Sequence, residues 1–83
     1  MKQFTIKRKV VIEEKVDCNM FIAHKIRERR EKAGMTQQNL ANKLGLSRTS
    51  MVNIEQGRRH ATIRRLYLLC KLFRVKSDTF LPF

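Results

Sequence analysis

Four neighbouring side chains carry hydrogen-bonding or methyl groups: Arg48, Thr49, Val52 and Asn53. The guanidinium of Arg48 is a planar fork of donors that matches the two acceptors on the major-groove edge of a guanine. The amide of Asn53 offers a donor beside an acceptor, which is the pattern that pairs with an adenine. Thr49 or Val52 suits contact with the methyl group of a thymine. Side chains of these types are able to read DNA bases, although Arg48 could instead contact a phosphate or stay in solvent.

Helical spacing puts these four residues on one face. Met51 and Ile54 are the apolar positions of the same segment, and the apolar stripe of a surface helix faces the core. With Met51 and Ile54 turned inward, the four candidate residues are left on the outer surface. Ser47 comes just before them, and its hydroxyl can accept a backbone N–H at a helix start. The pattern therefore predicts a helix at about residues 47–56.

A second short helix precedes this one and is separated from it by Gly45. Thr36 can cap its start, and Gly45 can take the left-handed conformation that ends a helix and turns the chain. Leu40 and Leu44 give it an apolar face, and Ala41 is small where two helices would cross. We expect the two helices to pack against each other and a common core.

This pair of helices resembles the helix-turn-helix of the Cro/repressor-type (XRE) regulators of phages and bacteria. The resemblance extends from about Phe21 to Leu81 and rests on Gln37, Leu40, Ala41, Leu44, Gly45, Leu46, Met51, Ile54, Glu55, Gln56 and Gly57. It implies an all-α fold, a compact five-helix lambda-repressor-like DNA-binding domain, here over residues 18–83. The helix at 47–56 would be the recognition helix in the major groove of double-stranded DNA, and the positioning helix before it would cross the backbone.

The resemblance also implies roles for residues outside the recognition helix. In the family, a glutamine at the place of Gln37 contacts a phosphate and braces the recognition helix, and Gln38 is the adjacent alternative. An arginine late in the first helix commonly pairs with the glutamate that ends the recognition helix, which implies an ion pair between Arg30 and Glu55. Further contacts to the DNA backbone are expected from Ser50, Arg58 and Arg59.

Capping residues and periodicity predict the remaining helices. Asp17 and Asn19 are both competent caps for a first helix. Thr62 caps a fourth helix, whose inward side is predicted to carry Ile63, Leu66, Leu69, Cys70 and Phe73. Ser77 is expected to cap a last short helix that Pro82 closes.

Residues 1–17 read as a separate N-terminal extension. Phe4, Ile6, Val10 and Ile12 share one face of an alternating pattern, which predicts a strand. A lone strand leaves its backbone groups unpaired. It could pair with the same strand of a second subunit, lie on the domain, or remain a basic arm without fixed structure. Pairing across a two-fold axis is the leading hypothesis, because it would also cover the apolar face in a homodimer.

The charge balance favours a polyanion as partner. Nineteen Lys and Arg residues stand against seven Asp and Glu residues, which gives a net charge of +12. Nucleic acid and anionic membrane both fit that charge. However, no apolar run approaches the length of a membrane span, and the start of the chain lacks the apolar segment of a signal peptide. We expect a cytoplasmic protein, associated with the nucleoid when bound to DNA, with no membrane partner.

Catalytic and metal-binding chemistry find no support in the sequence. Cys18, Cys70, His24 and His60 do not have the spacing of a zinc site, and Cys70 suits the role of a small apolar side chain. No phosphate-binding glycine loop, paired carboxylates or catalytic set can be assembled. We expect no enzyme, no catalytic residues, no cofactor and no metal.

These patterns predict a sequence-specific transcriptional regulator that binds a palindromic operator as a homodimer. It would be similar to phage Cro and repressor proteins or to the controller proteins of restriction–modification systems. The family often has glutamine where this chain has Arg48 and Thr49, so no operator sequence follows from the resemblance. The alternative is an antitoxin that binds a toxin protein through the N-terminal extension and regulates its own operon.

Overall fold

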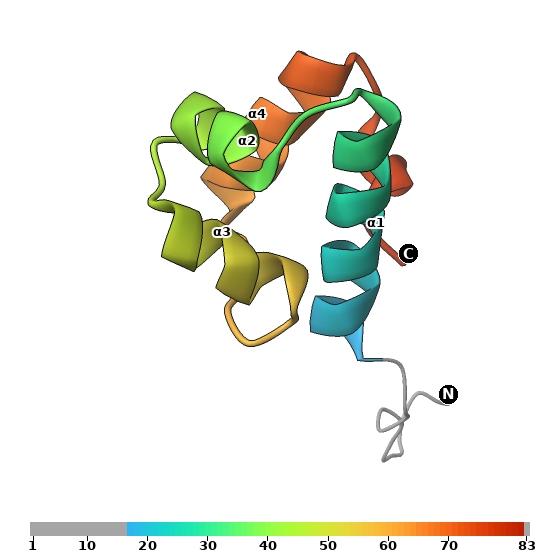
Figure 1. The fold of residues 1–83 in the computed structure, drawn as a ribbon. Helices are drawn as coiled ribbons and strands as arrows, with labels where there is room; N and C mark the ends of the chain where they lie inside the picture. The colour runs from blue at the N-terminus through green and yellow to red at the C-terminus, as the bar shows by residue number, and fades with distance from the viewer. Residues whose placement is uncertain (1–16, 83) are drawn as a thin grey trace, which may run out of the picture.

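Four α-helices make up most of residues 17–82, the part of the chain that the computed structural model describes (Figure 1). They are α1 (Cys18–Lys32), α2 (Gln37–Leu44), α3 (Arg48–Glu55) and α4 (Ile63–Phe73), and a single 3₁₀ turn, η3 (Ser77–Thr79), follows them. No strand occurs between residues 17 and 82. The predicted all-α class is confirmed for this part of the chain. The strand predicted in the N-terminal extension lies outside the described residues.

The prediction of a fifth helix is wrong, because η3 takes its place. Lys76, not Ser77, occupies the N-cap position of η3, and it makes no side-chain capping bond. The turn cannot grow into a helix because Leu81 precedes Pro82, and a proline disfavours the α conformation of the residue before it. Pro82 also lacks the N–H that a next helical turn would use.

Capping bonds and one glycine define the turn between α2 and α3. Thr36 and Asn39 form a capping box at the start of α2, in which the N–H of Asn39 donates to Thr36 Oγ1 at 3.0 Å. Gly45 ends α2 with a left-handed φ of 70°, as its position in the sequence predicts. Ser47 caps α3 by accepting the N–H of Ser50 at 3.1 Å. Local sequence thus fixes where both helices begin and how the chain turns between them.

One apolar core joins all four helices to the C-terminal segment. α3 contacts both α2 and α1, while α4 contacts α2 and η3. Met51 of α3 and Phe80 after η3 are almost fully buried, with Ala23, Ile26, Leu40, Ala41, Leu44, Ile54, Leu66 and Leu69. After α4 the chain returns beside α1, so its C-terminal end closes the core on that side (Figure 1). This packing holds α3 by its inner face and leaves its outer face free.

Candidate nucleic-acid interface

The outer face of α3 carries the four residues predicted to meet bases. Arg48 and Thr49 lie exposed in the first turn of α3, and Val52 and Asn53 are half-buried one turn later. Met51 and Ile54 of the same helix are buried, with 0% and 3% of their surface exposed. The helix is therefore divided into a core face and a solvent face, as the spacing of the apolar residues requires.

Ser50 joins the start of α3 to the loop that follows it. Arg59 Nη1 donates to Ser50 Oγ at 2.8 Å, and the Ser47 hydroxyl donates to the same oxygen at 3.1 Å. The guanidinium of Arg59 thereby lies against the N-terminal turn of α3, nine residues back along the chain. A cation is held next to the residues that would face a DNA backbone.

Arg58 reaches back to the same helix. Its Nη1 donates to Asn53 Oδ1 at 3.4 Å, a long and exposed contact. The carbonyl of the Asn53 amide is thus oriented toward the loop, and its NH₂ group remains for a ligand. Arg58 and Arg59, predicted as backbone contacts, and Asn53, predicted as a base contact, belong to one continuous surface.

A buried ionic network holds α3 from its other side. Glu55, of which 7% is exposed, is the one buried charged residue of the described chain. Its carboxylate accepts Arg30 Nε at 2.7 Å and Arg30 Nη2 at 3.2 Å, which is the bidentate geometry of a strong ion pair. Arg30 Nη1 also donates to the carbonyl of Met35 at 2.8 Å. The Arg30–Glu55 pair ties α1 to the end of α3 and to the turn before α2.

The two glutamines at the start of α2 differ in what they contact. Gln37 Nε2 donates to Glu55 Oε1 at 3.1 Å, so its amide joins the network that holds α3. Gln38 Nε2 donates to Asn42 Oδ1 at 2.9 Å, along its own helix, and does not reach α3. The geometry gives Gln37 a bracing contact and leaves Gln38 exposed beside it.

Asn19 makes a contact that the sequence does not reveal. Its Nδ2 donates to the carbonyl of Gly57 at 2.7 Å, although 38 residues separate the two. The side chain reads as a possible helix cap, but Asp17 takes that role by accepting the N–H of Met20 at 3.2 Å. No periodicity links the first turn of α1 to the end of α3, so only the fold brings them together.

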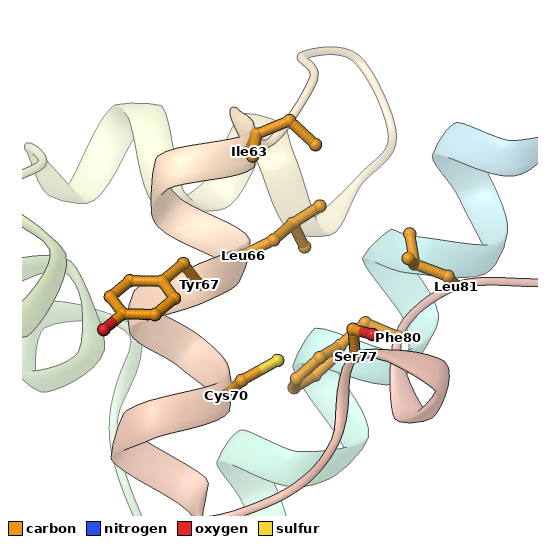
Figure 2. Close-up of a pocket in the computed structure, with 7 residues that line it drawn as sticks. All are labelled: Ile63, Leu66, Tyr67, Cys70, Ser77, Phe80 and Leu81. Carbon is orange, nitrogen blue, oxygen red and sulfur yellow. The ribbon is translucent and has the colours of Figure 1, made fainter.

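A pocket of about 240 Å³ lies away from these residues, between α4 and the C-terminal segment (Figure 2). Its lining is predominantly apolar and consists of Ile63, Leu66, Tyr67, Cys70, Ser77, Phe80 and Leu81. Burial, with a smaller effect of the Asp78 carboxylate, raises the pKa of the Cys70 thiol. The thiol therefore stays protonated at neutral pH and contributes apolar surface to the pocket.

The prediction that Ile63 faces the core is wrong, because this residue lies at the rim of the pocket. Ile63, expected to face the core, is 79% exposed, and Tyr67 beside it is 60% exposed. Helical side chains tilt toward the N-terminus of their helix, so the side chain of Ile63, the first residue of α4, extends past the end of the helix. Two large apolar side chains thus project next to an apolar hollow.

Between residues 17 and 82, no group of three or more His, Cys, Asp or Glu side chains lies close enough to hold a metal ion. Within that range, no helix has both the length and the apolar character needed to cross a bilayer.

Residues 26–80, which run from the middle of α1 to the residue after η3, match the helix-turn-helix family pattern. The chain belongs to the helix-turn-helix family. An uncharacterized HTH-type transcriptional regulator of Archaeoglobus fulgidus is 37% identical to this helix-turn-helix protein over 54 residues, which are 65% of this chain and 77% of that protein. The predicted family is thereby confirmed, as is the prediction of a regulatory protein and not an enzyme.

Solved structures share the fold. The wild-type restriction-modification controller protein C.Esp1396I is 33% identical to this helix-turn-helix protein and superposes with a TM-score of 0.66, over 80% of this chain and 86% of that one. The controller protein C.AhdI from Aeromonas hydrophila has a TM-score of 0.67 over 75% of this chain and 94% of that one. Because its identity is only 22%, that second likeness shows the fold alone.

Proposed function

We propose that this helix-turn-helix protein regulates transcription by binding double-stranded DNA with α3 in the major groove. One observation carries the proposal: α3 is fixed by its buried face and by Glu55, while Arg48 and Thr49 stand exposed in its first turn. In a helix-turn-helix the N-terminal residues of the second helix meet the base edges. The net charge of +12 supports a polyanionic partner.

Base readout is assigned to the outer face of α3. Arg48 pairs with a guanine, Asn53 pairs with an adenine, and Thr49 or Val52 contacts a thymine methyl group. The Asn53 pairing requires Arg58 to release the amide carbonyl, and the long 3.4 Å contact between them makes that release inexpensive.

Backbone contacts surround this readout face. Arg59 is held at the start of α3 by Ser50, and Arg58 adjoins it in the same exposed loop. Gln37 and Gln38 lie at the start of α2, where unpaired backbone N–H groups favour a phosphate. These residues position the protein on the duplex and carry no sequence information themselves.

The DNA-binding unit is residues 18–83, and two copies bind a palindromic operator with half-sites about one helical turn apart. A single module of this size makes few base contacts, so a dimer is needed for useful specificity. The rim residues Ile63 and Tyr67 and the pocket beside them form the surface that we assign to the dimer. A projection and a hollow on one face suit a two-fold contact, because each copy can fill the hollow of the other. No charged side chain lines this pocket, which matters for two chains that each carry +12.

Selection of bound duplexes from a random DNA pool tests the proposal. We expect enrichment of a palindromic consensus that contains a guanine at a fixed place in each half-site. Recovery of duplexes without any shared sequence would contradict sequence-specific regulation and leave only general polyanion binding.

The antitoxin alternative places a toxin protein on residues 1–17. Nearly all of these residues lie outside the described part of the chain. Co-purification of the tagged protein from its native host, followed by mass spectrometry, separates the two functions. A stoichiometric protein partner that is released by deletion of residues 1–17 would favour the antitoxin.

A further inference from the structure

The first turn of α1 contains an amide that capping does not use. Asp17 is the N-cap of α1, since its carboxylate accepts the N–H of Met20. Asn19 lies two residues later, half-buried, and donates from Nδ2 to the carbonyl of Gly57 at 2.7 Å. This is a short hydrogen bond between the start of the first helix and the end of the third.

Gly57 is the residue at which the chain leaves α3. Its own N–H donates to the carbonyl of Ile54 at 3.1 Å, and the N–H of Arg58 donates to the carbonyl of Asn53 at 2.9 Å. Both N–H groups are therefore used inside α3, whereas the carbonyl of Gly57 is held by α1. The φ of Gly57 is 76°, and a side chain at this position would overlap the sulfur of Met20, so the first turn of α1 also packs on the Gly57 backbone.

The direction of this carbonyl determines where the following residues point. A peptide group is planar, so the orientation of the Gly57 carbonyl fixes the plane that contains the nitrogen and Cα of Arg58. The next two side chains, Arg58 and Arg59, then reach back to Asn53 and Ser50 of α3. One hydrogen bond from α1 thus orients the backbone that carries both arginines.

We infer that Asn19 is a positioning residue for DNA binding, which acts through Gly57 to aim Arg58 and Arg59 at the phosphates. The inference rests on the proposed function. The side chain of Asn19 makes no hydrogen bond to Arg58 or Arg59, and its effect passes through the backbone of the loop. Removing its amide leaves base readout by Arg48 unchanged and weakens the sequence-independent part of binding.

The test measures DNA affinity as a function of salt concentration for the full-length protein. Asn19→Ala removes the amide, and Asn19→Leu removes it at similar volume. Log affinity falls linearly with log salt concentration, and each phosphate contact adds about 1 to the steepness of that fall. We expect both variants to make the slope shallower by about 1 to 2. The preference at the base position assigned to Arg48 stays at the wild-type value.

Two backgrounds supply the matched control. On Arg58→Ala/Arg59→Ala, Asn19→Ala has no further effect on the slope, because the groups that it positions are gone. In the Arg48→Ala background, Asn19→Ala makes the slope shallower by the same amount as it does in the wild-type protein. Urea unfolding of each variant identifies conditions in which all are folded, and binding is compared there.

Two results overturn the inference. One is a wild-type slope for Asn19→Ala, and the other is an equal loss with and without Arg58 and Arg59. Failure of the proposed function looks different, since the wild-type protein would then select no DNA sequence at all.

Discussion

Arg48 and Arg59 place the same functional group in two different settings. Arg59 is held by Ser50 at 2.8 Å, whereas the Arg48 side chain is exposed and makes no hydrogen bond or ion pair within residues 17–82. A guanidinium that is already oriented loses little side-chain freedom when it meets a phosphate. A free guanidinium can adapt its fork to a base edge, but ordering it costs conformational entropy. The two settings suit positioning and readout respectively.

Replacing Arg48 by Ala tests its assignment to readout. We expect binding to weaken by about 1–3 kcal/mol on the preferred operator, with preference lost at one base position. Competition binding with operators that carry each base at that position measures the effect. Lys43→Ala is the control, because Lys43 is an exposed cation of α2 outside the assigned contacts. An equal loss on every operator would remove Arg48 from the readout surface.

Residue spacing predicted the exposed face of α3 well and the contacts between elements poorly. Met51 and Ile54 identify the inner side of α3, so the outer side follows by periodicity. The bonds from Arg59 to Ser50 and from Asn19 to Gly57 depend on how a loop and two helices meet, and no short-range pattern encodes that meeting. The ion pair of Arg30 with Glu55 could be anticipated only because the resemblance supplied it.

α3 is an eight-residue element that tertiary contacts must hold. Helices this short are marginal in water by themselves. Met51 and Ile54 anchor its inner face, Ser47 caps its start, and Glu55 fixes its end through Arg30. The absence of the predicted fifth helix has a similar cause. The segment before Pro82 is too short for a stable helix, and no side-chain capping bond supports its start.

Breaking the Arg30–Glu55 pair should loosen the attachment of α3. The Arg30 side chain is 12% exposed and the Glu55 side chain 2%, so neither charge has much water to replace its partner. We expect Arg30→Met to cost about 3–5 kcal/mol of unfolding free energy, because it leaves a buried carboxylate with Gln37 as its main donor. Urea denaturation of Arg30→Met, Glu55→Gln and the double variant measures the coupling. Additive losses would contradict an energetic link between α1 and α3.

The two glycines that flank α3 separate backbone strain from packing. Gly45 and Gly57 both have left-handed φ values, of 70° and 76°, but only at Gly57 would a side chain meet another residue, Met20. Alanine at either position should cost about 1–2 kcal/mol from its backbone conformation. We expect Gly57→Ala to cost about 1 kcal/mol more, because Met20 must give up apolar contact. On a Met20→Ala background, thermal or urea unfolding should give the two glycine substitutions equal costs.

At the scale of the whole molecule, charge and apolar surface set opposite conditions for association. A net charge of +12 repels a second copy through solvent, and repulsion grows as salt is removed. The apolar pocket on α4 and its projecting rim favour contact all the same. DNA between two copies would neutralise much of the repulsion, so operator binding and dimerisation should reinforce each other.

Sedimentation of Ile63→Glu tests the assigned dimer surface. A carboxylate that is buried against the apolar hollow of a partner would be strongly unfavourable, so we expect a monomer where the wild type is a dimer. Met20→Glu serves as the control, because Met20 is also a large exposed apolar side chain but lies on α1, away from the pocket. Monomers from both variants would point to a general charge effect.

Deletion of residues 1–15 distinguishes this surface from the predicted strand pair. If the α4 surface forms the dimer, the shortened protein sediments as the wild type does. Loss of the dimer on deletion, with Ile63→Glu still dimeric, would favour strand pairing across the two-fold axis.

The contacts that fix α3 do not involve the exposed residues of its first turn, so these residues can be substituted without disturbing the fold. Arg48 and Thr49 are exposed and contribute no bond to the network of Arg30, Gln37 and Glu55 or to the core. Randomising residues 48 and 49 should therefore give a library in which most members fold and differ in the operators that they select. The residues assigned to base readout can therefore be changed separately from those that stabilise the fold, and new DNA specificities could be sought without redesigning the scaffold.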